Sequence, residues 1–211
     1  MIRVLLVDDH AVVRTGFRLL LESHAELSVA GEADTGEAAC RRYVELEPDV
    51  VVMDLAMPGM GGLEALRRIR AHHPDARVLA LSAHDDPVHA RRALREGALG
   101  FLSKRGAPEA LIEAVTTIAA GQRYLDQNVA QRLALGSDEG AGKSPIERLS
   151  EREFEVFMRL ARAESVARIA EDLKLSASTV GTHLYNIKQK LGVSNQSELT
   201  LLAVRHGLLE A

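Results

Sequence analysis

The chain has 211 residues, of which 46% are hydrophobic and 27% charged, and its formal net charge is -4. This length favours two domains, and the acidic balance excludes a broadly basic nucleic-acid-binding protein, so that any DNA-binding surface must be local. No apolar run approaches the roughly 20 residues that span a bilayer, and Asp8 and Asp9 come too early for a secretory signal. Cys40 is the only cysteine, so no intrachain disulfide can form. We therefore expect a cytoplasmic protein without membrane contact.

Short apolar segments alternate with helical patterns over the first half of the chain. The apolar segments predict buried strands at 4–7, 27–30, 50–53, 78–81 and 100–102. The helical patterns between and after them lie roughly at 12–23, 35–46, 62–72, 87–96 and 107–120. Because parallel neighbours need crossover helices, this alternation predicts an α/β fold with a doubly wound, five-stranded parallel sheet.

The composition changes after this first domain, which we place at residues 1–121. Residues 136–145 are rich in glycine, serine and charge and lack an apolar anchor, which predicts a flexible linker. Residues 122–135 are ambiguous and have room for a short helix around 129–135. We therefore place a linker at 122–146 and a second domain at 147–211.

The second domain carries no strand signal and is predicted to be all-α. Four candidate N-caps precede its helical patterns: Ser150, Ser165, Ser176 and Asn195. Gly192 and Gly207 stand where the last two helices should end. The pattern predicts four helices in a small compact domain.

Polar residues stand at the predicted strand ends of the first domain. Asp8 and Asp9 follow the first strand, Asp54 follows the third, Ser82 follows the fourth and Lys104 follows the fifth. In a doubly wound sheet these ends share one edge, where ligands bind. Carboxylates that lie together repel one another unless a cation lies between them, and few hard oxygen ligands suit Mg²⁺. A carboxylate can also form an aspartyl phosphate, whose oxygens Lys104 and Ser82 would contact.

Residues 2–121 resemble the receiver domain of two-component response regulators. The matching segments are Val4–His10, Val52–Met60, Leu81–Ala83 and Gly100–Lys104. The resemblance implies a flavodoxin-like fold in which a sensor histidine kinase phosphorylates Asp54. It also implies that Mg²⁺ is held by Asp8, Asp9, Asp54 and the backbone carbonyl of Ala56.

The resemblance further implies a switch. In such receivers the hydroxyl at the Ser82 position turns toward the phosphoryl group, and an aromatic side chain three residues before the lysine repacks. That residue is Phe101 here, where tyrosine is more usual, and the alternative interpretation of Phe101 is a plain core aromatic. Ala56 and His84 flank the phosphoryl group, and of these only His84 could orient an attacking water. We expect the phosphoryl lifetime to depend on His84, unless His84 is merely an exposed loop residue.

The segment after Ser176 predicts an amphipathic helix. Its apolar stripe consists of Val180, Leu184, Ile187 and Leu191. The opposite face contains no acidic residue and consists of Ser178, Gly181, Thr182, Tyr185, Lys188 and Gln189. Such a helix suits the major groove of DNA, although most amphipathic helices with polar outer faces are ordinary surface helices.

Residues about 148–209 resemble the LuxR/NarL-type output domain. The matching residues lie at 149–153, 169–170, 175–176, 179–180, 183, 190–193 and 205–208. The resemblance implies base contacts from Gly181, Thr182 and Tyr185. Phosphate contacts are expected from Lys188, Lys190 and the hydroxyls of Ser178 and Thr179.

Several positions of this second domain leave alternatives open. The family often has lysines where this chain has Ser178 and Gly181, so fewer counterions are released and DNA binding is expected to depend on dimerisation. The last helix, with Leu199, Leu202 and Ala203, either supplies the dimer contact or belongs to the core. For His183 a structural role is favoured over a DNA contact.

These observations predict a transcription regulator of the NarL/FixJ type, not an enzyme. Phosphorylation of Asp54 would produce a homodimer that binds double-stranded DNA, with RNA polymerase as a further candidate partner. An aspartyl-phosphate phosphatase is a weaker alternative, because Ala56 stands where such enzymes need a general acid. A regulator that acts through protein contacts and has lost DNA binding is the other alternative, motivated by the missing lysines.

Overall fold

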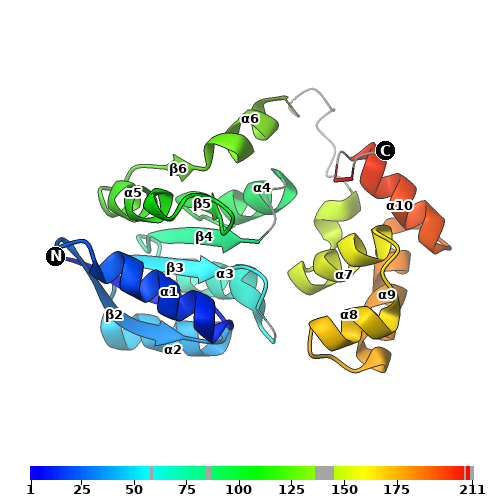
Figure 1. Cartoon of the computed structure of the whole chain (residues 1–211), viewed down its shortest axis with the longest axis horizontal. Coiled ribbons are helices and arrows are strands. Elements are labelled where there is room, and N and C mark those ends of the chain that lie inside the picture. The colour runs from blue at the N-terminus through cyan, green and yellow to red at the C-terminus, as the bar shows by residue number, and fades with distance from the viewer. Residues whose placement is uncertain (58, 84–86, 136–144, 207, 210–211) are drawn as a thin grey trace. The chain divides into compact units, whose positions relative to one another are not determined.

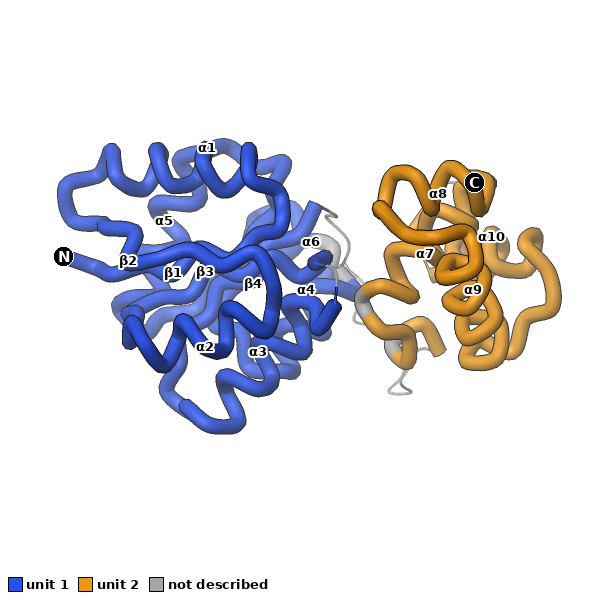
Figure 2. The backbone as a smooth tube through the Cα atoms, turned by 90° about the horizontal axis from the view of Figure 1, so that it is seen from below, with its two compact units in different colours: residues 1–140 blue, residues 141–211 orange. Residues whose placement is uncertain are grey.

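The computed structural model describes residues 1–57, 59–83, 87–135, 145–206 and 208–209 (Figure 1). The chain forms two compact units, residues 1–140 and 141–211 (Figure 2). Two positions discussed above, His84 and Gly207, lie outside the described residues, as do residue 58 of the segment Val52–Met60 and residues 136–144 of the expected linker. Within the described residues no helix is both long enough and apolar enough to cross a membrane.

The first unit is built on a parallel sheet with the strand order β2-β1-β3-β4-β5-β6. The strands are β1 (Ile2–Val7), β2 (Leu27–Ala33), β3 (Val50–Asp54), β4 (Val78–Ser82), β5 (Gly100–Ser103) and β6 (Tyr124–Leu125). The helices are α1 (Ala11–Glu22), α2 (Gly36–Leu46), α3 (Gly61–His72), α4 (Pro87–Arg95), α5 (Pro108–Ala119) and α6 (Gln127–Leu135). The predicted doubly wound, flavodoxin-like class is confirmed.

The predicted number of strands was one too low. The sixth strand, β6, is two residues long and pairs with β5 through Gly100 with Tyr124 and Phe101 with Leu125. Two residues cannot show the alternating pattern by which a strand is recognised in sequence. The pairing exists because the turn after α5, in which Gly121 has φ +77°, returns the chain along the free edge of β5.

Alternate residues of the central strands serve two separate cores, because successive strand side chains point to opposite faces. Val4, Leu6 and Val52 pack with residues of α1 and α5, whereas Leu5 and Met53 pack with residues of α2, α3 and α4. Figure 2 shows α1 and α5 on one side of the sheet and α2 and α3 on the other. All of these strand positions are buried, as predicted for a sheet covered on both faces.

The segment expected to be a linker, 122–146, contains β6 and α6. Val129 of α6 is fully buried in the core that Phe101 also joins, and α6 contacts α4. The first unit therefore uses residues beyond 121 to cover the edge of its sheet at β5.

Where the structure describes it, the second unit contains a 3₁₀ turn at Pro145–Arg148 and four helices. These are α7 (Glu151–Ala161), α8 (Val166–Asp172), α9 (Ala177–Leu191) and α10 (Gln196–Arg205). Each helix begins at its predicted cap, whose side chain accepts a hydrogen bond from the backbone N–H three residues on. The predicted all-α class is confirmed.

The core of the second unit gathers around two aromatic rings of α7. Phe154 and Phe157 are fully buried, with ring centroids 5.9 Å apart. Leu199 and Ala203 of α10 are also fully buried, which assigns these two residues to the core rather than to an exposed contact surface. Gly192 ends α9 with φ 67°, a conformation that glycine adopts without strain.

Candidate functional site

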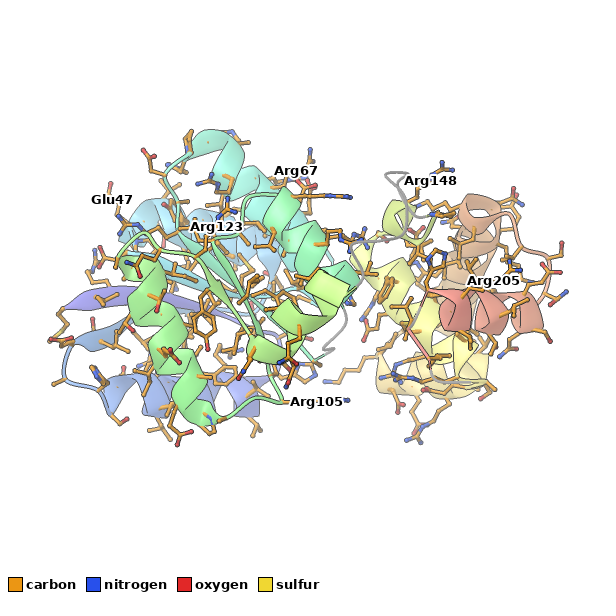
Figure 3. All side chains as sticks on the ribbon, turned by 90° about the horizontal axis from the view of Figure 1, so that it is seen from above. Glu47, Arg67, Arg105, Arg123, Arg148 and Arg205 are labelled. Atoms are coloured by element: carbon orange, nitrogen blue, oxygen red, sulfur yellow. The ribbon has the colours of Figure 1, made fainter. Side chains whose placement is uncertain are left out.

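The carboxyl ends of four strands bring the predicted polar residues together. Asp8 follows β1, Asp54 ends β3, Ser82 ends β4 and Lys104 follows β5. Lys104 Nζ lies 2.6 Å from Asp8 Oδ2 and 2.8 Å from Asp54 Oδ2. The side chains of both aspartates are only 2% exposed and that of Lys104 is 13% exposed. The neighbouring Arg105, labelled in Figure 3, is exposed, so of these two consecutive cations only Lys104 serves the site.

Backbone hydrogen bonds hold the two buried carboxylates in place. Asp8 Oδ1 accepts the N–H of His10 at 2.8 Å, and Asp54 Oδ1 accepts the N–H of Ala56 at 3.2 Å. The N–H of Lys104 donates to the carbonyl oxygen of Ser82 at 2.8 Å. Each residue is thus anchored at the end of its own strand, which preorganises the site.

A close backbone contact supports Asp54 from behind. Gly62, in the first turn of α3, leaves no room for a side chain, because a Cβ there would lie 1.8 Å from the carbonyl oxygen of Asp54. Its N–H donates to the carbonyl oxygen of Leu55 at 3.1 Å. The start of α3 can pack directly against the strand that carries Asp54 only because residue 62 is glycine.

Burial and charge oppose one another in this site. Burial raises the pKa of Asp54 above its ordinary value, although Lys104 acts in the opposite direction. Burial acts to lower the pKa of Lys104, but Asp54 and Asp8 together outweigh it and raise this pKa. The single ammonium of Lys104 therefore faces the two buried carboxylates of Asp8 and Asp54, and the negative charge that it does not neutralise can be offset by a further cation.

The donor set at this edge fits a divalent metal ion. Asp8, Asp9, His10 and Asp54 each offer one ligand atom, and these atoms lie within 4.8 Å of one another. Asp9 Oδ1 is buried and has no hydrogen-bond partner among the described residues. A buried carboxylate oxygen without a donor is unfavourable unless a cation satisfies it, and carboxylate oxygens are ligands that Mg²⁺ accepts. The cluster includes His10, which directly follows Asp9 and was not among the predicted ligands.

Two predicted residues lie beside this cluster. Ser82 is 1% exposed. Phe101 is fully buried and is paired with Ala80 on the neighbouring strand β4. The backbone carbonyl of Phe101 accepts the N–H of Asp126 at 3.0 Å, which links β5 to the residue before α6. Ala56, two residues after Asp54, is partly buried, and its carbonyl is still only a predicted metal ligand.

The α9 helix presents most of the predicted DNA-binding residues to solvent. Val180 and Ile187 are buried, as predicted for the apolar stripe. On the other side the exposed residues are Ser178, Thr179, Gly181, Thr182 and Tyr185, and Lys188 is partly exposed. Tyr185 is 64% exposed, which is unusual for an aromatic side chain without a partner surface.

Several polar groups at the start of α9 bind one another. Ser176 Oγ lies 2.7 Å from Ser178 Oγ and 2.8 Å from Thr179 Oγ1, within hydrogen-bonding distance. The hydroxyl of Thr182 donates to the carbonyl oxygen of Ser178 at 3.1 Å. These bonds hold the first turn of α9 in a defined conformation.

Lys190 lies on a different side of α9. Its Nζ is 2.5 Å from Glu153 Oε2 of α7, and the Glu153 carboxylate also accepts the N–H of Ser150 at 2.7 Å. The lysine expected to contact DNA phosphate is therefore engaged within the domain, and Lys188 is the cation left on the outer face. His183 is partly buried, and burial lowers its pKa, which agrees with the structural role favoured for it.

Two protein families match the chain, one for each part of it. Residues 4–116 match the family described as "Response regulator receiver domain". Residues 147–203 match the family described as "Bacterial regulatory proteins, luxR family". Both descriptions are of regulatory proteins.

Relatives match along the whole chain. Response regulator GacA of Pseudomonas viridiflava is 43% identical over 212 residues, covering 100% of this chain and 99% of its own. Response regulator UvrY of Escherichia coli K12 is 41% identical, covering 100% and 97%. Among solved structures, the RcsB response regulator of Salmonella typhimurium is 28% identical with a TM-score of 0.62, covering 97% and 98%. A structure of two RcsB dimers bound to two parallel DNAs is also 28% identical, with a TM-score of 0.60, covering 96% and 98%.

The order of the parts thus agrees with the geometry, in which an acidic strand-end site precedes a four-helix unit with an exposed polar helix. The chain belongs to the two-component response regulators of the NarL/FixJ type, transcription regulators with a receiver domain and a LuxR-type helix-turn-helix DNA-binding domain.

Proposed function

We propose that Asp54 accepts a phosphoryl group from a sensor histidine kinase and that this modification controls dimerisation and sequence-specific DNA binding. The observation that carries the proposal is the position of Lys104 Nζ, 2.6 Å from Asp8 and 2.8 Å from Asp54. The buried carboxylate of Asp54 can act as a nucleophile, and the fixed ammonium of Lys104 can neutralise negative charge on the phosphoryl group that Asp54 accepts.

The transfer can be written with the residues of this chain. A carboxylate oxygen of Asp54 attacks the phosphorus of a phosphohistidine, the phosphorus–nitrogen bond breaks, and the departing imidazole keeps the electron pair and takes up a proton. Asp8, Asp9, Asp54 and the Ala56 carbonyl would hold Mg²⁺, which neutralises charge on the phosphoryl oxygens. Lys104 then pairs with the phosphoryl group, while Asp8 continues to hold its ammonium.

The switch would pass from the site to β5 and α6. The Ser82 hydroxyl donates to a phosphoryl oxygen, which moves the end of β4 toward the site. Phe101 of β5 is paired with Ala80 of β4, and its carbonyl oxygen accepts the N–H of Asp126 just before α6. Repacking of Phe101 would therefore move the last helix of the first unit, through packing alone, because phenylalanine has no hydroxyl to bind.

The α9 helix would make the contacts with DNA. Thr182, Gly181 and Tyr185 are exposed and would face base edges, and Lys188 would contact phosphate, with Ser178 and Thr179 at the helix start. Among the described residues of α9, only Lys188 supplies a cation on that face, so one copy is expected to bind weakly. Two copies double the phosphate contacts, and RcsB is bound to DNA as dimers.

The proposal is tested on the full chain with Mg²⁺ and a small phosphodonor. Intact-mass spectrometry should detect one added phosphoryl group on the wild type and none on Asp54→Asn. Asp34→Asn, which changes an exposed aspartate after β2, should behave as the wild type. Light scattering should give a dimer only for phosphorylated protein, and selection of genomic fragments should give a shared motif only in that state.

One outcome would favour a different function. If the phosphorylated dimer shows no salt-dependent affinity for any DNA, the second unit acts through protein contacts. The engagement of Lys190 by Glu153 is the observation that motivates this second candidate.

A further inference from the structure

The acidic site contains a nitrogen donor that the phosphorylation chemistry does not use. His10 occupies the N-cap position of α1, and its side chain makes no cap hydrogen bond. Its Nδ1 lies 3.0 Å from Asp9 Oδ1 and 3.4 Å from Asp8 Oδ1. The ring is 65% exposed, so its nitrogen approaches the cluster from the solvent side.

The short distance between His10 and Asp9 is an ion-pair contact when the imidazole is protonated, but it does not have the geometry of a hydrogen bond. Asp9 Oδ1 is buried and has no hydrogen-bond partner among the described residues, although His10 Nδ1 is only 3.0 Å away. Two ligand atoms on adjacent positions of an octahedron with bonds of about 2.1 Å are separated by about 3 Å. The spacing of these two atoms is therefore the spacing of neighbouring ligands on one metal ion.

Backbone contacts hold the main chain of His10 beside the cluster. The N–H of His10 donates to Asp8 Oδ1 at 2.8 Å, so the backbone of His10 cannot move away without losing a bond to a buried carboxylate. Arg14, one turn into α1, holds the carbonyl oxygen of Asp8 at 2.5 Å. The chain from Asp8 to the first turn of α1 is thus tied down at both ends of the histidine.

We propose that His10 Nδ1 joins Asp8, Asp9 and Asp54 as a metal ligand and raises the affinity of the site for first-row transition-metal ions, Mn²⁺ among them, relative to Mg²⁺. The inference rests on the proposed acidic metal site and adds the residue that decides which ion it prefers. Imidazole strengthens the binding of first-row transition metals, whereas Mg²⁺ is served by oxygen ligands and water. His10 therefore raises Mn²⁺ affinity and leaves Mg²⁺ affinity to the carboxylates.

The test uses the full chain and its His10→Ala variant, titrated with Mn²⁺ alone. Free Mn²⁺ is counted by its electron paramagnetic resonance signal, and Mg²⁺ affinity is measured by competition. His72→Ala is the matched control, because His72 is an exposed histidine of α3 outside the cluster. Electron spin echo spectra report directly whether a nitrogen nucleus is bound to Mn²⁺.

The wild type and His72→Ala should show nitrogen coupling, which His10→Ala loses. Mn²⁺ affinity should fall about tenfold in His10→Ala, and Mg²⁺ affinity should change less than about twofold. Mg²⁺ binding together with absent nitrogen coupling, or coupling that persists in His10→Ala, overturns the role of His10 and leaves the proposed function standing. If the wild type binds neither ion, the acidic metal site itself fails and both proposals fall.

Discussion

Lys190 Nζ lies 2.5 Å from Glu153 Oε2 and joins the last turn of α9 to the first turn of α7. Glu153 is 6% exposed and is also the acidic member of the Ser150 capping box. The same carboxylate therefore closes the start of one helix and fixes the position of the helix proposed to read DNA.

Replacing Lys190 should loosen this junction. Lys190→Ala leaves the Glu153 carboxylate without its cation, and we expect a loss of about 1–2 kcal/mol of local stability, moderated because Lys190 itself is 40% exposed. Hydrogen exchange of the α7 and α9 amides measures it. Lys188→Ala on the same helix is the control, and an equal loss of protection there would show that the ion pair contributes nothing.

The same ion pair should respond to acid. Burial alone would raise the pKa of Glu153, but hydrogen bonds from Lys190 and Ser150 outweigh it and hold the pKa below its usual 4.5. Because the folded pKa is depressed, this stability is present above about pH 4.5 and is lost as pH falls through the folded pKa. The protection of the α7 amides from hydrogen exchange should therefore decrease more steeply with falling pH in the wild type than in Glu153→Gln. Gln keeps the capping hydrogen bond without the charge, so identical profiles would contradict the prediction.

Replacing Lys104 should destabilise the first unit, because its ammonium offsets the repulsion between the carboxylates of Asp8 and Asp54. Lys104→Gln leaves Asp8 and Asp54 buried together, and the free energy of unfolding of this unit should fall by about 3 kcal/mol without divalent ions. Added Mg²⁺ should restore more stability in the variant than in the wild type. Urea unfolding followed by circular dichroism gives both values. Arg105→Gln, at the adjacent exposed position, should change neither, and an Mg²⁺ response no larger in Lys104→Gln than in the wild type would contradict the argument.

Gly62 should tolerate no side chain. An added Cβ would lie 1.8 Å from the Asp54 carbonyl oxygen and 2.8 Å from Leu55 Cα, so the backbone must move. Gly62→Ala is expected to lose at least about 2 kcal/mol of stability and to slow phosphorylation of Asp54. Gly16→Ala, in α1 with nothing within 4 Å, should instead gain about 0.5–1 kcal/mol. Thermal unfolding compares them; equal stability of the two variants would refute the steric account.

Tyr185 and Lys188 should affect DNA binding differently. Tyr185→Ala is expected to leave stability within about 0.5 kcal/mol, since the side chain is 64% exposed, but to weaken binding to the selected fragment about tenfold. Lys188→Ala should weaken binding to all fragments alike and reduce the salt slope by about 1. Fluorescence anisotropy over a salt series separates the two effects. A Tyr185→Ala variant that binds every fragment as the wild type does would remove this residue from the interface.

Sequence periodicity was sufficient for most elements because each carried its own local signal. The four caps of the second unit were recognisable as Ser150, Ser165, Ser176 and Asn195, since capping is a local hydrogen bond within one turn. β6 was missed for the opposite reason: its two residues are a strand only because β5 lies beside them.

What the sequence determined by itself was the grouping of Asp8, Asp54, Ser82 and Lys104. Parallel strands end at a common edge, so residues far apart in the chain must meet there once the strand pattern is recognised. Only the tertiary structure decided which way a given side chain points within that frame. It turned Lys190 toward Glu153, and it placed His10 Nδ1 3.0 Å from Asp9 Oδ1. Both outcomes depend on how a helix is rotated against its neighbour and where its first turn begins. Packing of the whole unit decides these angles, because no residue type prescribes them alone.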